Sequence, residues 1–182
     1  PGTSALGELT FLIPEDLDME TAEFVVGSAV ESQARIPLDG SGPATRLEPT
    51  EIVIAGETAT ELVDIELTRA TLRYDVAATH QQLEAGELAL TLYVDVISRV
   101  PGDHRLTADD IALVHPDGST TAPVHTALDE VPGDAEGVRS VDHSVTFVID
   151  AQTSGDFTLL LPLDDNFSPE AGEAEMMFDF SL

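Results

Sequence analysis

The residues best suited to bind an ion are closely spaced carboxylates near the start of the chain. Asp16, Asp18 and Glu20 alternate with apolar residues, as oxygen ligands do at the start of a calcium-binding loop. The segment departs from the EF-hand pattern, because Thr21 stands where that loop needs glycine and Gly27 where it needs glutamate. It is therefore a weak candidate for a calcium site.

A second acidic segment holds the other calcium candidates, Asp164 and Asp165. A structural calcium ion needs about six to eight convergent oxygen ligands. The chain has 35 Asp and Glu residues, so neighbouring carboxylates arise by chance, and solvated acidic turns are the favoured interpretation of both segments. We expect no cofactor, with calcium as the alternative.

Histidine offers a second kind of metal ligand. His115 and His125 flank a predicted hairpin and could share a metal with Asp117 or Asp129. A metal site needs three or four convergent ligands, and only the two histidines suggest convergence, so solvated side chains are favoured. The chain has no cysteine, which excludes disulfides, thiolate metal sites and a cysteine nucleophile.

The established catalytic motifs are absent from the sequence. There is no G-x-S-x-G elbow, no H-E-x-x-H helix and no phosphate-binding loop, and without lysine there is no Schiff-base chemistry. The chain also lacks Trp and has only two Tyr, so it offers few aromatic platforms for a sugar. We therefore expect that this protein is not an enzyme. The alternative, a carboxylate- or metal-dependent hydrolase, needs a pocket that gathers groups with perturbed pKa values.

The charge of the chain limits its partners. Seven Arg and no Lys stand against 35 acidic residues in 182, a formal net charge of −28, while 42% of residues are hydrophobic. That apolar content excludes a disordered acidic tail. Scarce basic residues disfavour nucleic acid and anionic membrane surfaces as partners, and no apolar run approaches a membrane span. A basic protein or cell-envelope component is favoured.

The elements that position these residues follow a period of two, which indicates strands. The segment from Leu88 to Val96 alternates without a break and predicts one long strand whose second face is partly covered. Alternation also predicts strands at 63–68, 72–77 and 144–149. Shorter candidates are Leu9–Ile13, Glu23–Val30, Ala34–Leu38, Glu51–Ile54, Asp110–Val114, Ser119–Val124, Phe157–Leu161 and Met176–Phe180.

Turn and helix signals complete the prediction. His115-Pro116-Asp117-Gly118 has the composition of a type I turn and should close a hairpin. Thr107 could cap a single helical turn up to Asp110. About ten to twelve short strands with frequent turns predict an all-β fold, an antiparallel Ig-like β-sandwich with an extra N-terminal hairpin or partial second unit.

The domain organisation has two interpretations. The favoured one is a single sandwich domain over residues 1–182. The alternative divides the chain at the linker-like segment 39–43 into an N-terminal hairpin segment, 1–38, and an Ig-like sandwich, 45–182. Residues 129–140 read as a long acidic loop, of the length that is often functional.

A resemblance covers roughly residues 60–161. It is carried by the long strand Gly86–Val96, by Asp110-Ile111-Ala112-Leu113-Val114-His115-Pro116-Asp117-Gly118, by Val145-Thr146-Phe147-Val148-Ile149 and by Asp156-Phe157-Thr158-Leu159. These segments resemble Ig-like extracytoplasmic domains of unknown function from bacterial lipoproteins and membrane-anchored proteins. The resemblance implies a sandwich and supplies no catalytic residues.

The leading functional hypothesis is a non-enzymatic interaction or spacer domain at the cell envelope. It would lie outside the cytoplasm, at the cell surface, and be anchored by a segment outside this chain. The chain opens Pro1-Gly2-Thr3-Ser4 with no basic or apolar leader, as an excised ectodomain or a cytosolic protein would. A salt-adapted or calcium-stabilised surface protein is the second hypothesis, because lysine-free acidity suits high salt.

Overall fold

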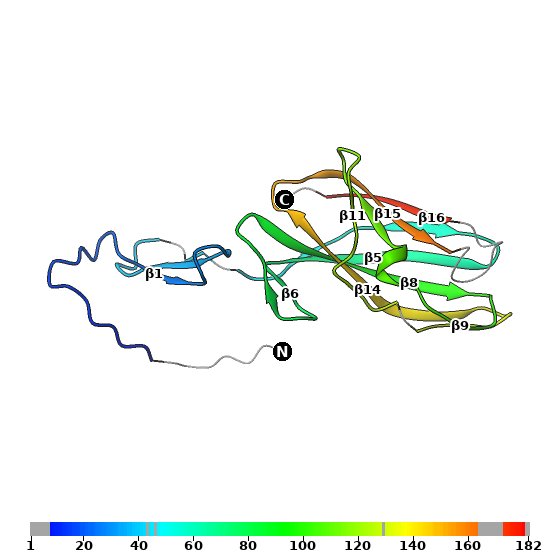
Figure 1. Cartoon of the computed structure of the whole chain (residues 1–182), viewed down its shortest axis with the longest axis horizontal. Helices are drawn as coiled ribbons and strands as arrows, with labels where there is room; N and C mark the ends of the chain where they lie inside the picture. The colour runs from blue at the N-terminus through cyan, green and yellow to red at the C-terminus, as the bar shows by residue number, and fades with distance from the viewer. Residues whose placement is uncertain (1–7, 43, 46, 129, 164–172, 181–182) are drawn as a thin grey trace.

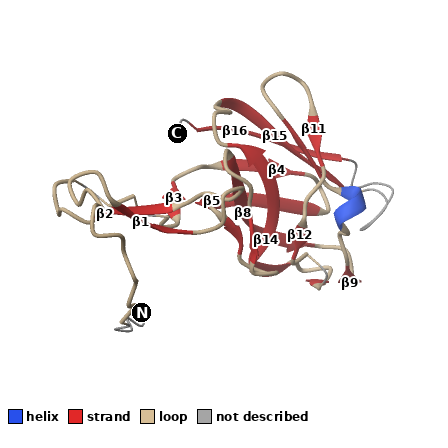
Figure 2. Cartoon of the chain, turned by 60° about the vertical axis from the view of Figure 1, so that its left-hand side comes forward, coloured by secondary structure: helices blue, strands red, loops and turns tan. Residues whose placement is uncertain are grey.

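Two antiparallel sheets form the body of the protein in a computed structural model that describes residues 8–42, 44–45, 47–128, 130–163 and 173–180 (Figure 2). The larger sheet contains β12 (His125–Thr126), β14 (Val138–Asp150), β8 (Glu87–Ser98) and β5 (Val63–Arg73), with β3 (Thr50–Ile52) and β4 (Gly56–Ala59) both on β5. The smaller sheet is ordered β11 (Thr120–Thr121), β10 (Ala112–Val114), β15 (Gly155–Pro162) and β16 (Glu173–Phe180).

Three two-stranded ribbons and one helical turn accompany the sheets. The ribbons pair β1 (Glu23–Val26) with β2 (Ala34–Pro37), β6 (Asp75–Val76) with β7 (Gln81–Gln82), and β9 (Gly102–His104) with β13 (Val131–Gly133). The turn is a 3-10 helix, η1 (Ala108–Asp110). The predicted all-β, antiparallel sandwich is confirmed.

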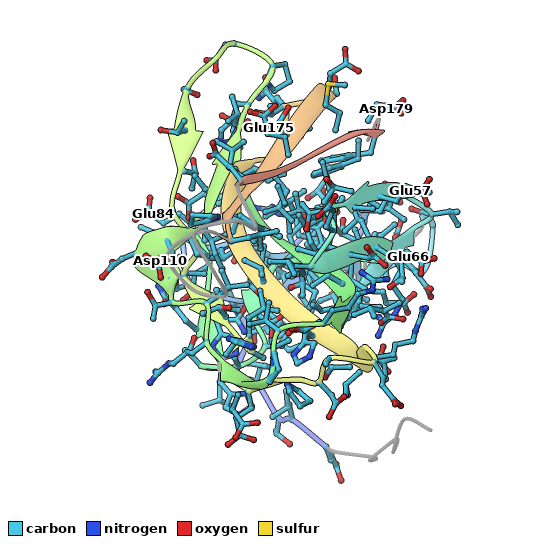
Figure 3. All side chains as sticks on the ribbon, turned by 90° about the vertical axis from the view of Figure 1, so that its right-hand side faces the viewer. Glu57, Glu66, Glu84, Asp110, Glu175 and Asp179 are labelled. Atoms are coloured by element: carbon cyan, nitrogen blue, oxygen red, sulfur yellow. The ribbon has the colours of Figure 1, made fainter. Side chains whose placement is uncertain are left out.

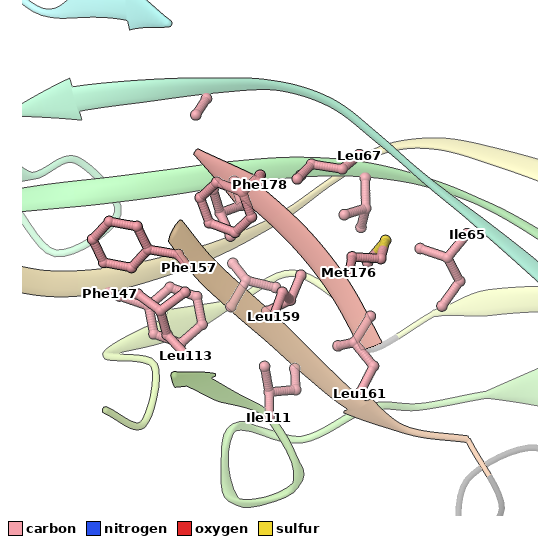
Figure 4. Packing of buried hydrophobic residues seen from close by; sticks show 14 of the residues in the cluster. Ile65, Leu67, Ile111, Leu113, Phe147, Phe157, Leu159, Leu161, Met176 and Phe178 are labelled. Carbon is pink, nitrogen blue, oxygen red and sulfur yellow. The ribbon is translucent and has the colours of Figure 1, made fainter. Parts of the chain in front are cut away.

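The hydrophobic core lies between the two sheets (Figure 4). Alternate residues of each long strand point into it, so the smaller sheet meets the larger one with an apolar face. Phe157 stacks on two rings of β16, with centroids 5.8 Å from Phe178 and 4.9 Å from Phe180. These stacked rings and the aliphatic side chains of β5, β8 and β14 seal the interior of the sandwich.

A β-bulge in β5 explains why the sequence reads as two separate strands there. Ile65 and Leu67 point inward, and so do Ala70 and Leu72. The pairing with β8 skips one residue between Leu67 and Arg69. The extra residue at a bulge shifts the alternation from odd to even positions. The predicted strands 63–68 and 72–77 are therefore largely one strand, which ends at Arg73.

The second face of β8 is partly covered, as predicted. Ala89 and Thr91 on that face are buried. Val76 and Leu83 pack there with Ala89 as a small second cluster. The prediction had placed Val76 in the strand of Leu72, but the chain turns after Arg73, so Val76 joins the ribbon β6–β7 on the other side of the sheet.

Local turns match the sequence signals in two places. His115 and Gly118 close the β10–β11 hairpin, with Gly118 N donating to His115 O at 2.9 Å. At η1 the Asp110 carboxylate accepts from the Thr107 backbone N–H and hydroxyl at 3.1 and 2.6 Å. The segment 129–140 was wrongly predicted to be one long loop, because it contains β13 and the start of β14.

The β1–β2 ribbon stands beside the sandwich rather than in it (Figure 1). It is held by a backbone bond from Ala85 N to Val30 O, 2.8 Å long, and by a bridge between Glu31 and Glu84. Both buried hydrophobic clusters of the described chain begin beyond residue 50. Among the described residues, no helix has the length and apolar character to cross a membrane.

Candidate functional site

The β1–β2 ribbon is built on a tight reversal of the chain. Phe24 pairs with Ile36 in antiparallel register, and Gly27 has a φ of 119° at the end of β1. A side chain at Gly27 would be strained at that φ and would meet the Ser32 carbonyl. The Glu31 carboxylate accepts from the Ser28 N–H at 3.0 Å, and this bond holds the pKa of Glu31 below its usual value.

An open apolar groove lies between this ribbon and the segment that precedes it. One face of the ribbon presents Phe24 and Ile36, and the ring of Phe11 lies 5.6 Å from that of Phe24. The hollow has a volume of about 690 Å³. We call this hollow the N-terminal groove. It is lined by Leu9, Phe11, Leu12, Ile13, Leu17, Ala22, Glu23, Phe24, Ile36 and Leu38.

The groove is open to solvent rather than packed. Phe11 is 61% exposed and Leu12 is fully exposed, at 103%. Eleven of the fifteen exposed large hydrophobic residues of the described chain fall between residues 9 and 38. Such a concentration marks a binding surface more often than an ordinary solvated face.

Leu9–Ile13 was predicted to be a strand, and this prediction is wrong. The segment belongs to no sheet, and within the described chain none of its backbone groups bonds to other backbone. Its apolar residues run consecutively from Phe11 to Ile13, so only part of them can face the ribbon. That consecutive run, ahead of the linker-like segment 39–43, is the signal in the sequence from which an exposed apolar surface could have been inferred.

One edge of the ribbon has unpaired backbone groups. Leu38 N donates to Ala22 O at 3.0 Å, which fixes the hydrogen-bonded pairs as 22 with 38, 24 with 36 and 26 with 34. The backbone groups of Glu23 and Val25 therefore point away from β2. Within the described residues, β1 has no second neighbouring strand, whereas the outer edge of β2 receives a bond from Thr45 N to Arg35 O at 2.8 Å.

Acidic residues are frequent in the segment that contains the groove, and one of them, Glu23, lines it. Glu23 forms an ion pair of 3.0 Å with Arg35, both side chains being largely exposed. No basic partner is recorded in the described chain for the carboxylates of Glu8, Glu15, Asp16, Asp18 and Glu20. The groove is therefore an apolar surface within a segment of the chain that carries a net negative charge.

Three of the calcium candidates, Asp16, Asp18 and Glu20, lie in the described part of the chain. Asp18 caps its own turn, accepting from Glu20 N at 3.0 Å and Thr21 Oγ1 at 3.2 Å. In the part of the chain that is described, no group of three His, Asp or Glu residues could hold a metal ion. Asp164 and Asp165 lie outside the described residues.

The two histidines considered as metal ligands are associated with different sheets. His115 follows β10, at the turn of the β10–β11 hairpin in the smaller sheet, and its Nε2 is 2.7 Å from Thr121 Oγ1. His125 pairs with Thr146 of β14 in the larger sheet, so the two histidines do not flank one hairpin. The pKa of Asp117 is lowered by its hydrogen bonds from Ser119, and Asp129 lies outside the described residues.

A hollow of about 420 Å³ on the outer face of the larger sheet is lined by several charged side chains, among them Asp64, Glu66, Asp95 and Arg139. Arg139 bridges Asp95 at 2.6 Å and Glu66 at 3.0 Å, which are opposite each other on neighbouring strands. Arg99 binds Asp64 at 3.0 and 2.6 Å. The hydrogen bond from Arg99 lowers the pKa of Asp64.

Asp64 and Asp95 are suited to stay ionised, not to donate protons, because the pKa of each is lowered. Burial raises the pKa of Asp95, but the N–H of Asp142 and the guanidinium of Arg139 outweigh it, and the pKa ends below its usual value. A general acid needs the opposite shift. Other carboxylates, among them Glu57, Glu84, Asp110, Glu175 and Asp179, are spread around the body (Figure 3).

Comparisons with known proteins give weak structural likenesses. No family model matches the chain, and no curated protein matches it. A candidate lipoprotein of Bacillus subtilis is similar with a TM-score of 0.46 and 13% identity, over 68% of this chain and 38% of that one. A conserved hypothetical protein of Bacillus anthracis is similar with a TM-score of 0.43 and 13% identity, over 63% of this chain and 92% of that one.

Proposed function

We propose that this chain is a non-enzymatic interaction domain of the cell envelope, which contacts a protein partner through the N-terminal groove. The acidic sandwich acts as a spacer that carries the groove. The observation behind this proposal is the open apolar hollow of about 690 Å³ between residues 9–17 and the β1–β2 ribbon.

The free energy that would be gained by burying this exposed apolar surface against a partner supports the proposal. Each large apolar side chain that moves from water into an interface contributes roughly 1.5–3 kcal/mol when fully buried. The groove offers several such side chains on one face, including Phe24 and Ile36. The sandwich seals its own core with other residues, so the groove side chains are available to a partner.

The location outside the cytoplasm is part of the same proposal. It is supported by the resemblance of residues 60–161 to extracytoplasmic domains of bacterial lipoproteins and membrane-anchored proteins. The anchor would be a segment outside this chain. Protease added to intact cells of the source organism should cleave the native protein without lysis, and complete resistance until lysis would contradict the location.

Photo-crosslinking in those intact cells tests the interaction. A benzoylphenylalanine at Leu12 in the groove should give a discrete crosslinked product. The matched control places the same probe at Val53, which is 94% exposed but lies on the sandwich. Equal products from both positions, or none from Leu12, would contradict groove-mediated binding.

The second candidate is a surface protein adapted to high salt. The net charge of −28 favours it, and so does the engagement of Arg69, Arg73, Arg99 and Arg139 in local ion pairs. Those pairs leave most carboxylates uncompensated, so the folded chain repels itself at low ionic strength. In a variant of this second candidate, calcium bound by the acidic residues of segment 16–20 would stabilise the protein.

A further inference from the structure

We propose that the N-terminal groove takes an extended segment of a partner protein, which adds as a strand to the free edge of β1 and carries alternating apolar and basic side chains. This inference rests on the proposed function and specifies its partner. Three features of the described residues carry it: the backbone edge, the apolar face and the net negative charge of residues 8–38.

The backbone edge fits a strand. The N–H and C=O groups of Glu23 and Val25 point outward from the ribbon, since the pairs 22 with 38 and 24 with 36 are the hydrogen-bonded ones. An added strand uses such groups for affinity and places its alternate side chains on the two faces. The opposite edge is less available, because Arg35 O already accepts from Thr45 N.

The apolar face fits alternate side chains of that strand. Phe24 and Ile36 lie on the groove side of the ribbon, with Phe11 above Phe24. A strand beside β1 would therefore place every second side chain over the groove. Those side chains should be apolar, because the lining of the hollow is almost entirely apolar.

The net negative charge of residues 8–38 favours basic residues at the remaining positions of the added strand. Residues 8–38 contain seven acidic residues and a single basic one, Arg35, which already pairs with Glu23. A second copy of this chain is disfavoured as the occupant, because it also carries a charge of −28 and has no lysine. An anionic membrane is disfavoured by the same charge.

A peptide titration tests the three features together. The probe is a labelled peptide of alternating Val and Lys. One control peptide replaces Lys with Glu, and another groups the same Val and Lys residues in two blocks. In fluorescence anisotropy with the full chain, the basic alternating peptide should bind. The other two should bind at least about tenfold more weakly. Equal binding of the acidic peptide would overturn the charge assignment.

Two pairs of variants separate the backbone edge from the side chains. Val25→Pro removes an N–H that points away from β2, so the ribbon keeps its ladder, whereas Val25→Ala keeps that N–H. Binding should fall by about tenfold or more in Val25→Pro and stay within about threefold in Val25→Ala. Phe24→Asp should abolish binding, and Val53→Asp on the sandwich should leave it unchanged. Equal binding by Val25→Pro and Val25→Ala would overturn strand addition.

The alternative occupants give distinct results. A dimer in light scattering that Phe24→Asp dissolves would identify a second copy and overturn the proposal. Groove-dependent binding to phosphatidylglycerol vesicles would identify a membrane and also overturn it. If no peptide binds but the crosslink at Leu12 forms in cells, the assignment of the partner fails while the proposed function stands.

Discussion

The ring of Phe11 lies 5.6 Å from the ring of Phe24, with the two planes tilted by 57°. This contact joins residues 9–13, which pair with no strand of the described chain, to the β1–β2 ribbon, which contributes no residue to the described hydrophobic clusters. Phe11 is 61% exposed and Phe24 is half-buried, whereas the stacked rings of Phe157, Phe178 and Phe180 are buried inside the sandwich. The contrast separates the packed sandwich from a surface whose apolar side chains are open to solvent, the surface that we propose contacts a partner.

Truncating a buried ring and truncating an exposed ring should change the free energy of unfolding by very different amounts. Phe157→Ala removes a fully buried ring and should lower the free energy of unfolding by about 3–5 kcal/mol. Phe11→Ala removes an exposed ring and should change it by less than about 0.5 kcal/mol. Urea denaturation with circular dichroism measures both. A large loss in Phe11→Ala would mean that the groove contributes to the stability of the sandwich.

The buried hydroxyl pair on β8 and β14 predicts a non-additive double mutant. Thr91 and Thr146 are 9% and 5% exposed, and their Oγ1 atoms are 3.0 Å apart. Thr91→Val leaves the Thr146 hydroxyl without this partner and should cost about 1–3 kcal/mol of unfolding free energy. The double Val variant should recover much of that loss. If the loss in the double variant equalled the sum of the losses in Thr91→Val and Thr146→Val, the two hydroxyls would not depend on each other.

The ion pair of Asp64 with Arg99 predicts a defined pH dependence. The hydrogen bond from Arg99 lowers the pKa of Asp64 below its usual value, so the folded state favours the ionised form. The stabilisation is complete above the unfolded pKa and is lost as the pH falls through the folded pKa. The difference in unfolding free energy between the wild type and Asp64→Asn should therefore shrink below about pH 4. A difference that grows on acidification would contradict the pairing.

Self-repulsion of the acidic coat predicts a dependence on salt. The Tm should rise as NaCl is increased from low to molar concentration, because screening weakens repulsion among carboxylates with a net charge of −28. CaCl₂ and MgCl₂ at equal ionic strength should raise the Tm by the same amount. A Tm that does not change with NaCl would exclude the salt-adapted candidate. A rise specific to calcium would instead support the calcium-stabilised one.

Much of the sandwich could be predicted because burial on one face leaves a period of two in the sequence. The long strand around Leu90 was found for this reason, and so was the cover on its second face over Ala89. The break in alternation after Leu67 was also visible, but a bulge and a strand end give the same pattern. Only the pairing with β8 distinguishes the two.

Long-range pairing was the part that sequence patterns could not supply. His125 follows β11 closely in the chain, yet it pairs with β14. Pro132 and Gly133 signal a loop, yet they pair with β9 as a short ribbon. At Leu9–Ile13 the residue types favour a strand, and the described chain provides no neighbour for one. In each case the outcome depends on which segment lies alongside, which local composition does not encode.

Amide hydrogen exchange of the full chain, with and without the alternating Val and Lys peptide, tests the central claim most directly. The amides of Glu23 and Val25 point outward from the β1 edge and should exchange fast in the free chain. Strand addition predicts that the peptide slows exchange at these two amides, with little change in β8 or β14. Unchanged exchange at both positions, or protection confined to the sandwich, would contradict the N-terminal groove as the binding site.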